Sequence, residues 1–133
     1  MRRSADKLQR LLEQIRAAGG VAHGFGTDAR KEDEVAALVS SIEADIGPIE
    51  VLVFNIGANV PGSILEETAR RYFKVWEMAC FAGFLSAREV ARHMVARGRG
   101  TILFTGATAS MRGSANFAAF AGAKHALRAL AQS

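Results

Sequence analysis

The stretch Gly100–Lys124, GTILFTGATASMRGSANFAAFAGAK, decides how this chain folds. It opens with an apolar run that predicts a strand over Thr101–Thr105, and a loop of small residues follows. We expect a helix from about Asn116. On that helix Phe120 and Lys124 are one turn apart, so their side chains share a face. The stretch therefore predicts a strand, a loop and a helix that presents two large side chains together.

Further strands and helices are predicted upstream of this stretch. The spacing of apolar residues predicts a helix capped by Ser4, a second over Lys31–Ile46 and a long third over about Thr68–Arg97. A weak alternation of apolar and polar residues predicts a short strand over Val21–Gly26. An apolar run predicts another strand over Val51–Phe54, buried on both faces. This alternation of helices and strands indicates an α/β fold with a parallel sheet and helices on both faces.

Composition and charge argue against several classes of protein. Half of the 133 residues are hydrophobic, which suffices for a core, and the net charge of +4 comes from scattered basic residues. Without a basic stripe, no binding to nucleic acid is expected. No apolar run reaches the roughly 20 residues of a membrane span, and the first residues lack the apolar core of a secretory signal. We therefore expect no membrane association and a cytoplasmic location.

Cysteine and histidine usage predicts neither a disulfide bond nor a metal site. Cys80 is the only cysteine, and we interpret it as a small buried hydrophobic residue because no adjacent base is evident. His23, His93 and His125 fall on unrelated predicted elements and lack the spacing of metal ligands.

Two segments are expected to meet at one edge of the sheet. Asn55 and Gly57 follow the strand Val51–Phe54, and the loop Thr105–Ser110 follows the next strand. In an open parallel sheet, ligands bind beyond the carboxyl ends of the strands. These two segments, with Lys124 on the helix that follows, therefore predict a binding site at that edge.

The order of these motifs resembles that of the short-chain dehydrogenase/reductases. VLVFNIG, Val51–Gly57, is similar to the DVLVNNAG motif of that family, and ILFTGAT, Ile102–Thr108, is similar to its strand-and-serine segment. Phe120-Ala-Gly-Ala-Lys124 stands where the family has Tyr-x-x-x-Lys. The resemblance covers nearly the whole chain, and it implies a partial Rossmann-like fold with a doubly wound parallel sheet.

The resemblance also implies a mechanism in which three of four residues are replaced here. In the family, a tyrosine exchanges a proton with the substrate oxygen, and a lysine lowers the pKa of that phenol and holds the nicotinamide ribose. A serine positions the carbonyl, and an asparagine completes a proton relay. Lys124 matches the lysine. The tyrosine, serine and asparagine positions fall on Phe120, Ala107 and Ala79, which carry no acid or base.

Hydroxyl groups in the loop after the last strand do not match the register of the family's serine. We interpret Thr105, Thr108 and Ser110 as hydroxyls bonded to local backbone. Substitution of one of them for the lost serine is the alternative.

The resemblance implies NADP or NAD as cofactor, although the family's Gly-rich phosphate-binding turn is absent from this chain. Arg2 and Arg3 match positions at which basic residues favour the 2′-phosphate of NADP, and ordinary terminal arginines are the alternative. Asp28 matches a residue that contacts the adenine, and capping of the following helix is its alternative role. Asn55 and Gly57 match the segment that passes close to the adenine ribose.

The family's strand order, 3-2-1-4-5-6-7, assigns the predicted strands to positions 3, 4 and 5. We therefore expect one incomplete domain over residues 1–133 that lacks the first two and last strands, as in an excised piece of a longer protein. Without strands 1 and 2, Val21–Gly26 has no neighbour to pair with. We expect this segment to be detached from the sheet or packed elsewhere.

Two functions are predicted as alternatives. The first is an NAD(P)-dependent short-chain oxidoreductase that transfers hydride between the cofactor and a small carbonyl or alcohol. The second is a pseudoenzyme, a non-catalytic relative that binds a nucleotide or acts as an interaction module through its helices, which the phenylalanine at Phe120 favours. Small and apolar faces on the helices 68–97 and 116–133 also predict a homo-oligomer.

Overall fold

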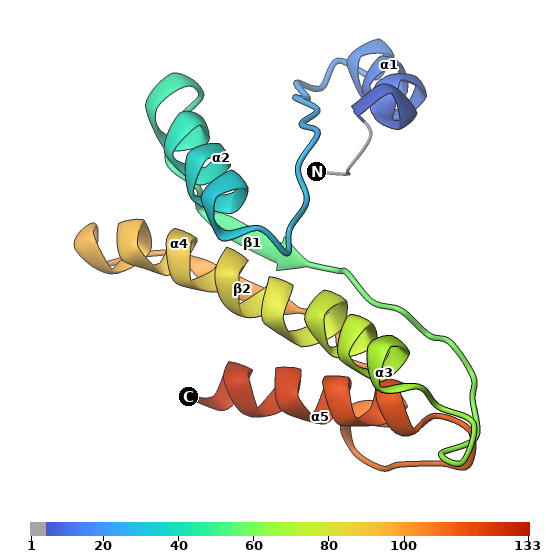
Figure 1. Cartoon of the computed structure of the whole chain (residues 1–133). Coiled ribbons are helices and arrows are strands. Elements are labelled where there is room, and N and C mark those ends of the chain that lie inside the picture. Colours follow the sequence, from blue (N-terminus) through green and yellow to red (C-terminus); the bar gives the residue numbers. More distant parts are fainter. Residues whose placement is uncertain (1–4) are drawn as a thin grey trace.

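The computed structural model describes residues 5–133 and shows helices packed on a small sheet (Figure 1). The described part begins with a 3₁₀ turn, Ala5–Leu8, and then alternates between helices and strands. In chain order the regular elements are α1 (Gln9–Ala17), α2 (Glu32–Asp45), β1 (Val51–Phe54), α3 (Ala69–Trp76), α4 (Ala82–Ala96), β2 (Thr101–Phe104) and α5 (Ala118–Gln132).

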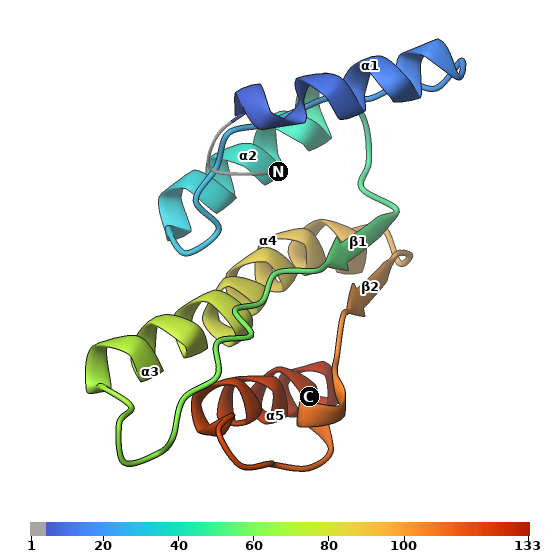
Figure 2. The same cartoon turned by 90° about the vertical axis from the view of Figure 1, so that its right-hand side faces the viewer.

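The two strands pair in parallel, with Val51 opposite Thr101 and Phe54 opposite Phe104. The α4 helix and the α5 helix lie along this pair, and α5 runs beside α3 and α4 in both views (Figures 1 and 2). The parallel α/β architecture expected from the sequence is therefore confirmed. The carboxyl ends of both strands point to the same edge, from which the loops to α3 and α5 depart.

Only one face of the strand pair is covered by helices in the described residues. Phe54 is buried among residues of α4 and α5, whereas Val51 and Val53 are 54% and 60% exposed. Leu103 on β2 is exposed to a similar extent. The predicted burial of Val51–Phe54 on both faces is therefore wrong. An apolar run makes such burial favourable, but a second layer must be present to provide it.

The segment Val21–Gly26 forms no strand, although alternation predicts one there. Apart from a bridge at Gly26, it is irregular, and the described sheet contains β1 and β2 alone. Leu8 and Leu12 pack against Gly24, so this segment contacts α1 and the turn before it, and Phe25 lines a cavity with Val51 and Val53 of β1. Its separation from the sheet is the expected outcome. Backbone N–H and C=O groups need a neighbouring strand to make a ladder, and neither β1 nor β2 pairs with this segment.

The long helix predicted over Thr68–Arg97 consists of three consecutive parts. Thr68 caps α3, because its Oγ1 accepts a 3.1 Å hydrogen bond from the Arg71 N–H. A π-helical segment, Glu77–Phe81, then joins α3 to α4 without a break in the helical path (Figure 1). Single π turns occur within α-helices and shift the register of the residues that follow.

Small residues allow α5 to approach α4 closely. Ala79 and Ala82 are fully buried at this contact. A Cβ atom at Gly83 would lie only 2.8 Å from Leu127 Cδ1 and 3.1 Å from Phe54 Cε1. The core between the helices is therefore filled by Phe54 and Leu127, and a larger residue at position 83 would separate them.

Candidate functional site

Lys124 is the central side chain of the candidate site. It lies on α5 and is 4% exposed, and its Nζ donates a 2.7 Å hydrogen bond to the main-chain carbonyl of Thr105. Burial lowers the pKa of Lys124 below its ordinary value, because the ammonium form loses hydration. A buried cation at the carboxyl edge of the sheet is costly, so its placement there fits a site rather than a solvated helix surface.

Gly57 brings the loop after β1 against this lysine. A Cβ atom at Gly57 would lie 3.7 Å from Cε and Nζ of Lys124 and 4.0 Å from Cε2 of Phe120. The two segments expected to converge, one after each strand, therefore meet at α5. Asn55 lies one residue beyond β1 and is exposed, so its predicted contact with the cofactor stays a prediction.

Phe120 and Ala107 line a common cavity of about 260 Å³. Phe120 presents a ring where the resemblance places a phenol, and the Lys124 Nζ lies 6.0 Å from the centre of that ring. Neither residue can donate a proton to a substrate oxygen. The remaining lining residues are uncharged: Asn59, Thr108, Ala109, Ser114 and Phe117.

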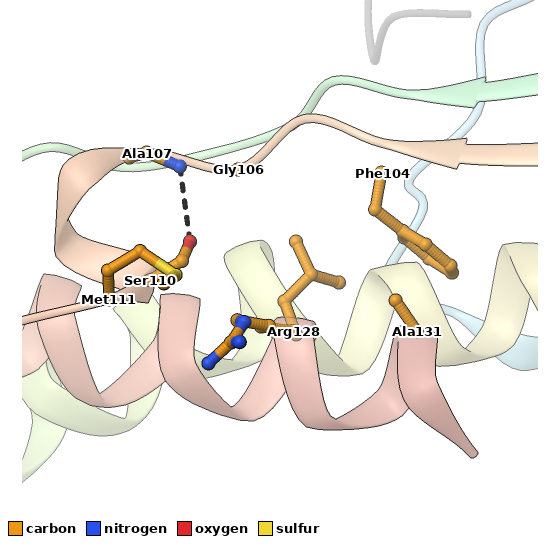
Figure 3. A pocket seen from close by; sticks show the side chains of 8 residues that line it. Phe104, Gly106, Ala107, Ser110, Met111, Arg128 and Ala131 are labelled. Carbon is orange, nitrogen blue, oxygen red and sulfur yellow. Dashed lines mark hydrogen bonds between the residues drawn. The ribbon is translucent and has the colours of Figure 1, made fainter.

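Ser110 has a structural role in the loop after β2. Its side chain is buried, and its Oγ accepts a 3.1 Å hydrogen bond from the Ala107 N–H (Figure 3). This agrees with its interpretation as a hydroxyl bonded to local backbone. The bond closes the short 3₁₀ turn Thr108–Ser110, which holds Ala107 in place beside the cavity of Phe120.

A second cavity, of about 280 Å³, lies between the end of β2 and α5 (Figure 3). Phe104 and Leu127 form its apolar floor, and the guanidinium of Arg128 lies at its rim. Because Ala107 lines both cavities, the turn around this residue separates them.

Ala79, which the resemblance aligns with the family's asparagine, is buried inside the protein. It is fully buried in the π-helical segment, where it packs with Val75, Ala119 and Ala123. Its methyl group supplies no hydrogen-bonding atom. Close packing of α5 against the π-helical segment is therefore what this position contributes.

Asp28 belongs to an ion network outside the cluster around Lys124. Its carboxylate accepts hydrogen bonds from Arg30, at 2.5 and 2.9 Å, and Arg30 also donates to Glu77 at 3.1 Å. The pKa of Arg30 is raised, first by its hydrogen bond to Asp28. The predicted adenine contact of Asp28 stays a prediction. Arg2 and Arg3 lie outside the described residues.

Sequence reasoning missed several residues of this region. Arg30 and Glu77 join the loop before α2 to the π-helical segment, and they are 47 residues apart in the sequence. Phe117 and Asn59 line the cavity beside Phe120. No spacing pattern signals contacts between such distant segments, so these assignments require the tertiary structure.

Membrane and metal features were sought among residues 5–133. No helix there combines the length and the apolar character that a membrane crossing requires. The same residues contain no cluster of three or more histidine, cysteine or carboxylate side chains that could hold a metal ion.

Comparison with proteins of known sequence shows a consistent set of relatives. The chain is 32% identical over 129 residues to a 2-dehydro-3-deoxy-D-gluconate 5-dehydrogenase from Formosa agariphila, covering 97% of this chain and 49% of that protein. It is 33% identical over 130 residues to a cis-4-hydroxycyclohexanecarboxylate dehydrogenase from Sinomonas cyclohexanicum, covering 97% of this chain and 51% of that protein. The chain thus spans about half the length of these curated relatives.

Solved structures share the fold. A short-chain dehydrogenase from Rhodopseudomonas palustris is 56% identical, with a TM-score of 0.94 over 98% of this chain and 61% of that one. A gluconate 5-dehydrogenase from Burkholderia cenocepacia J2315, in complex with NADP and tartrate, is 28% identical, with a TM-score of 0.91 over 96% of this chain and 50% of that one.

The family model for short chain dehydrogenases matches residues 1–133, the whole of the sequence. The motif order, the parallel strands and the lysine at their carboxyl edge agree with that match. This chain therefore belongs to the short-chain dehydrogenase family.

Proposed function

We propose that this chain forms part of an NAD(P)-dependent oxidoreductase site that acts on a small carbonyl or alcohol. The observation that carries the proposal is the buried ammonium group of Lys124, held by the Thr105 carbonyl beside Gly57. Support comes from the relatives, which are dehydrogenases by name, and from a similar structure that contains NADP. The chain covers about half of those relatives, so the reaction is proposed for the whole protein.

The residues present fit a nicotinamide nucleotide at the carboxyl edge of the sheet. Lys124 has three N–H donors, and Thr105 accepts from this ammonium group, so further donors can serve ribose hydroxyls. Gly57 leaves room beside this lysine, because it has no side chain. Asn55, Gly57 and Asp28 would hold the adenosine part. When bound, the nicotinamide would supply the hydride chemistry.

We assign the choice between NADP and NAD to Arg2 and Arg3, which lie outside the described residues. Arg2 and Arg3 would favour NADP by pairing with its 2′-phosphate. A phosphate contact of this kind is charge-assisted and bidentate when arginine makes it. A preference for NADPH over NADH that is lost in an Arg2→Ala, Arg3→Ala variant would support this assignment.

A second function, nucleotide binding without turnover, is favoured by the replaced catalytic residues. Phe120 and Ala107 face the cavity with a ring and a methyl group, and Ala79 is buried away from it. Loss of a general acid or base typically lowers a rate by about 10²–10⁴-fold. Lys124 would still hold a nucleotide. In this alternative the protein is a pseudoenzyme whose site binds and does not convert.

The uncharged cavity beside Phe120 restricts the substrate class. Its lining supplies amide and hydroxyl groups and two aromatic rings, with no charged side chain among the residues that form it. A neutral carbonyl or alcohol with an apolar ring or chain fits this surface better than a carboxylate, which would lie there without a partner.

The experiment that tests the proposal measures binding of NADPH and NADH, followed by turnover of a panel of neutral carbonyls. We expect binding to be lost in Lys124→Met and kept in Lys31→Met, an exposed lysine with its own acidic partner. Binding with turnover in the unmodified protein would support the oxidoreductase and refute the pseudoenzyme. Binding without turnover would support the pseudoenzyme, and absence of binding would refute both.

Self-association through the helices is proposed from an aromatic row on α3, the π-helical segment and α4. Phe73, Trp76, Phe81 and Phe84 stack in sequence with ring centroids 6.0 to 6.1 Å apart, and Arg88 lies 5.1 Å above Phe84. Phe73 is 60% exposed. Exposed aromatic rows are typical of protein interfaces.

Sedimentation velocity tests this interface directly. We expect Phe73→Ser with Phe84→Ser to shift the protein toward monomer. Val95→Ser, which removes an exposed apolar side chain near the other end of α4, serves as the matched control. A monomeric unmodified protein would contradict the assignment.

A further inference from the structure

Gly62 lies beneath the guanidinium group of Arg71. A Cβ atom at Gly62 would be 1.8 Å from Arg71 Nη2 and 3.0 Å from its Cζ, so no side chain fits while the guanidinium is there. The φ of Gly62 lies outside the left-handed region, so its backbone conformation would accept alanine. A larger residue at position 62 would therefore require the Arg71 guanidinium to move.

Glu67 holds the guanidinium in this position. Its two carboxylate oxygens accept from Nε and Nη2 of Arg71, at 2.5 and 3.1 Å. The Glu67 side chain is 6% exposed, unlike that of an ordinary surface ion pair one helical turn apart. The Arg71 N–H is itself fixed by the cap on Thr68. The Arg71 side chain is 40% exposed, so the pair is half-buried, and its two-point geometry restricts where the guanidinium can lie.

Gly62 ties the loop before α3 to the loop before α5. Its N–H donates a 2.7 Å hydrogen bond to the carbonyl of Asn116, and it forms a parallel bridge with Phe117. Asn116 has a φ of 64°, in the left-handed region that asparagine tolerates. Phe117 lines the cavity beside Phe120. The ion pair is thus connected to the cavity wall through one glycine.

We propose that Glu67 and Arg71 are positioning residues that press on Gly62 and so fix Phe117 in the wall of the cavity. Their effect would be on which molecules the cavity admits, because Phe117 supplies one of its two aromatic rings. The part of this proposal that concerns substrate choice rests on the proposed function. The part that concerns the position of Phe117 does not, since it needs neither cofactor nor turnover.

A double-mutant cycle tests the contact between Arg71 and Gly62. Amide hydrogen exchange at residue 62 reports the bond to Asn116, and the urea midpoint reports overall stability. We expect Gly62→Ala to raise exchange at residues 62 and 117 about tenfold or more, through local opening. In the Arg71→Ala background the same substitution should have little effect, because the clashing guanidinium is gone. An equal effect in both backgrounds would overturn the proposal.

Matched variants separate positioning from simple helix stabilisation. Glu67→Gln should raise exchange at residues 62 and 117 while slow amides in α4 stay protected, and Arg71→Lys should not restore protection because lysine lacks the two-point fork. Arg70→Ala, the exposed neighbour on α3, should leave these amides unchanged. If Glu67→Gln instead raised amide exchange uniformly across α3, α4 and α5, the role of Glu67 would be purely structural and the proposal would be refuted.

Cofactor binding, measured on the same variants, keeps the two proposals apart. If Glu67→Gln changes exchange at residue 117 but the unmodified protein binds no nucleotide, the positioning role stands and the oxidoreductase site fails. If the unmodified protein binds nucleotide and Glu67→Gln leaves exchange at residue 117 unchanged, the nucleotide site stands and the positioning role fails.

Discussion

The Nζ of Lys124 donates a 2.7 Å hydrogen bond to the main-chain carbonyl of Thr105, which follows β2 directly. The two residues are 19 positions apart in the sequence. The bond joins the carboxyl end of the strand to the helix that returns past it, so strand, loop and α5 form one unit. It also holds a cation in a place where burial disfavours charge.

The pH dependence of stability should show the burial of Lys124. Burial lowers the pKa of Lys124 in the folded state below the ordinary lysine value of about 10.5. The unfolded chain therefore binds more protons between the two values, and stability rises with pH there. Lys124→Met removes this pH-dependent contribution to the free energy of unfolding. We expect the free energy of unfolding of the unmodified protein, relative to this variant, to increase from neutral pH toward about pH 10.5 in urea titrations.

Lys31 provides a control of opposite sign. Its pKa is raised by the hydrogen bond to Glu34, so the stability that it contributes is present below its unfolded pKa and is lost as pH rises through the folded value. Relative to Lys31→Met, the unmodified protein should therefore keep its extra stability up to about pH 10.5 and lose it only at higher pH. The same slope for both variants would contradict the burial of Lys124.

Restoring the two missing hydroxyls should raise turnover. Phe120→Tyr supplies the phenol and Ala107→Ser the second hydroxyl, at two positions that share one cavity. We expect NADPH-dependent reduction of a neutral carbonyl to rise about 10²-fold or more in the double variant over the unmodified protein. Phe117→Tyr places a phenol in the same cavity but outside the Phe120-x-x-x-Lys124 spacing, so it should give no such gain. An equal gain from Phe117→Tyr would show that the position of Phe120 has no special role.

Gly83 should be intolerant of a methyl group. An alanine Cβ there would lie 2.8 Å from Leu127 and 3.1 Å from Phe54, both fully buried, so α4 and α5 would be forced apart. We expect Gly83→Ala to lower the free energy of unfolding by about 1–3 kcal/mol, as overpacking commonly does. Gly113→Ala meets no atom within 4 Å and should change stability little. Equal unfolding midpoints for the two variants would refute the close approach.

Cys80 should react slowly with thiol reagents in the folded protein. It is buried in the π-helical segment, and burial raises the pKa of its thiol. Because the thiolate is the nucleophile, the rate with a disulfide reagent should rise about 100-fold or more on unfolding in urea. A fast reaction in the native protein would show that the packing of α5 on this segment opens readily.

Local sequence patterns predicted the elements that depend on local contacts. The predicted strand Val51–Phe54 has the same bounds as β1. Phe120 and Lys124 share one face of α5, as their spacing requires. Burial was harder to predict. Val51 and Val53 have strand-forming side chains whatever covers them, so their exposure could be learned only from the arrangement of the layers.

The sequence by itself determined which chemical groups are available to the site. The resemblance aligns Phe120, Ala107 and Ala79, which carry no acid or base, with three of the four family positions, and it aligns Lys124 with the fourth. The tertiary structure alone decided the rest: Val21–Gly26 forms no strand, and Gly62 meets Phe117 across the site. The physical reason is that residue identity fixes protonation and size, whereas pairing and burial depend on neighbours that are distant in the chain.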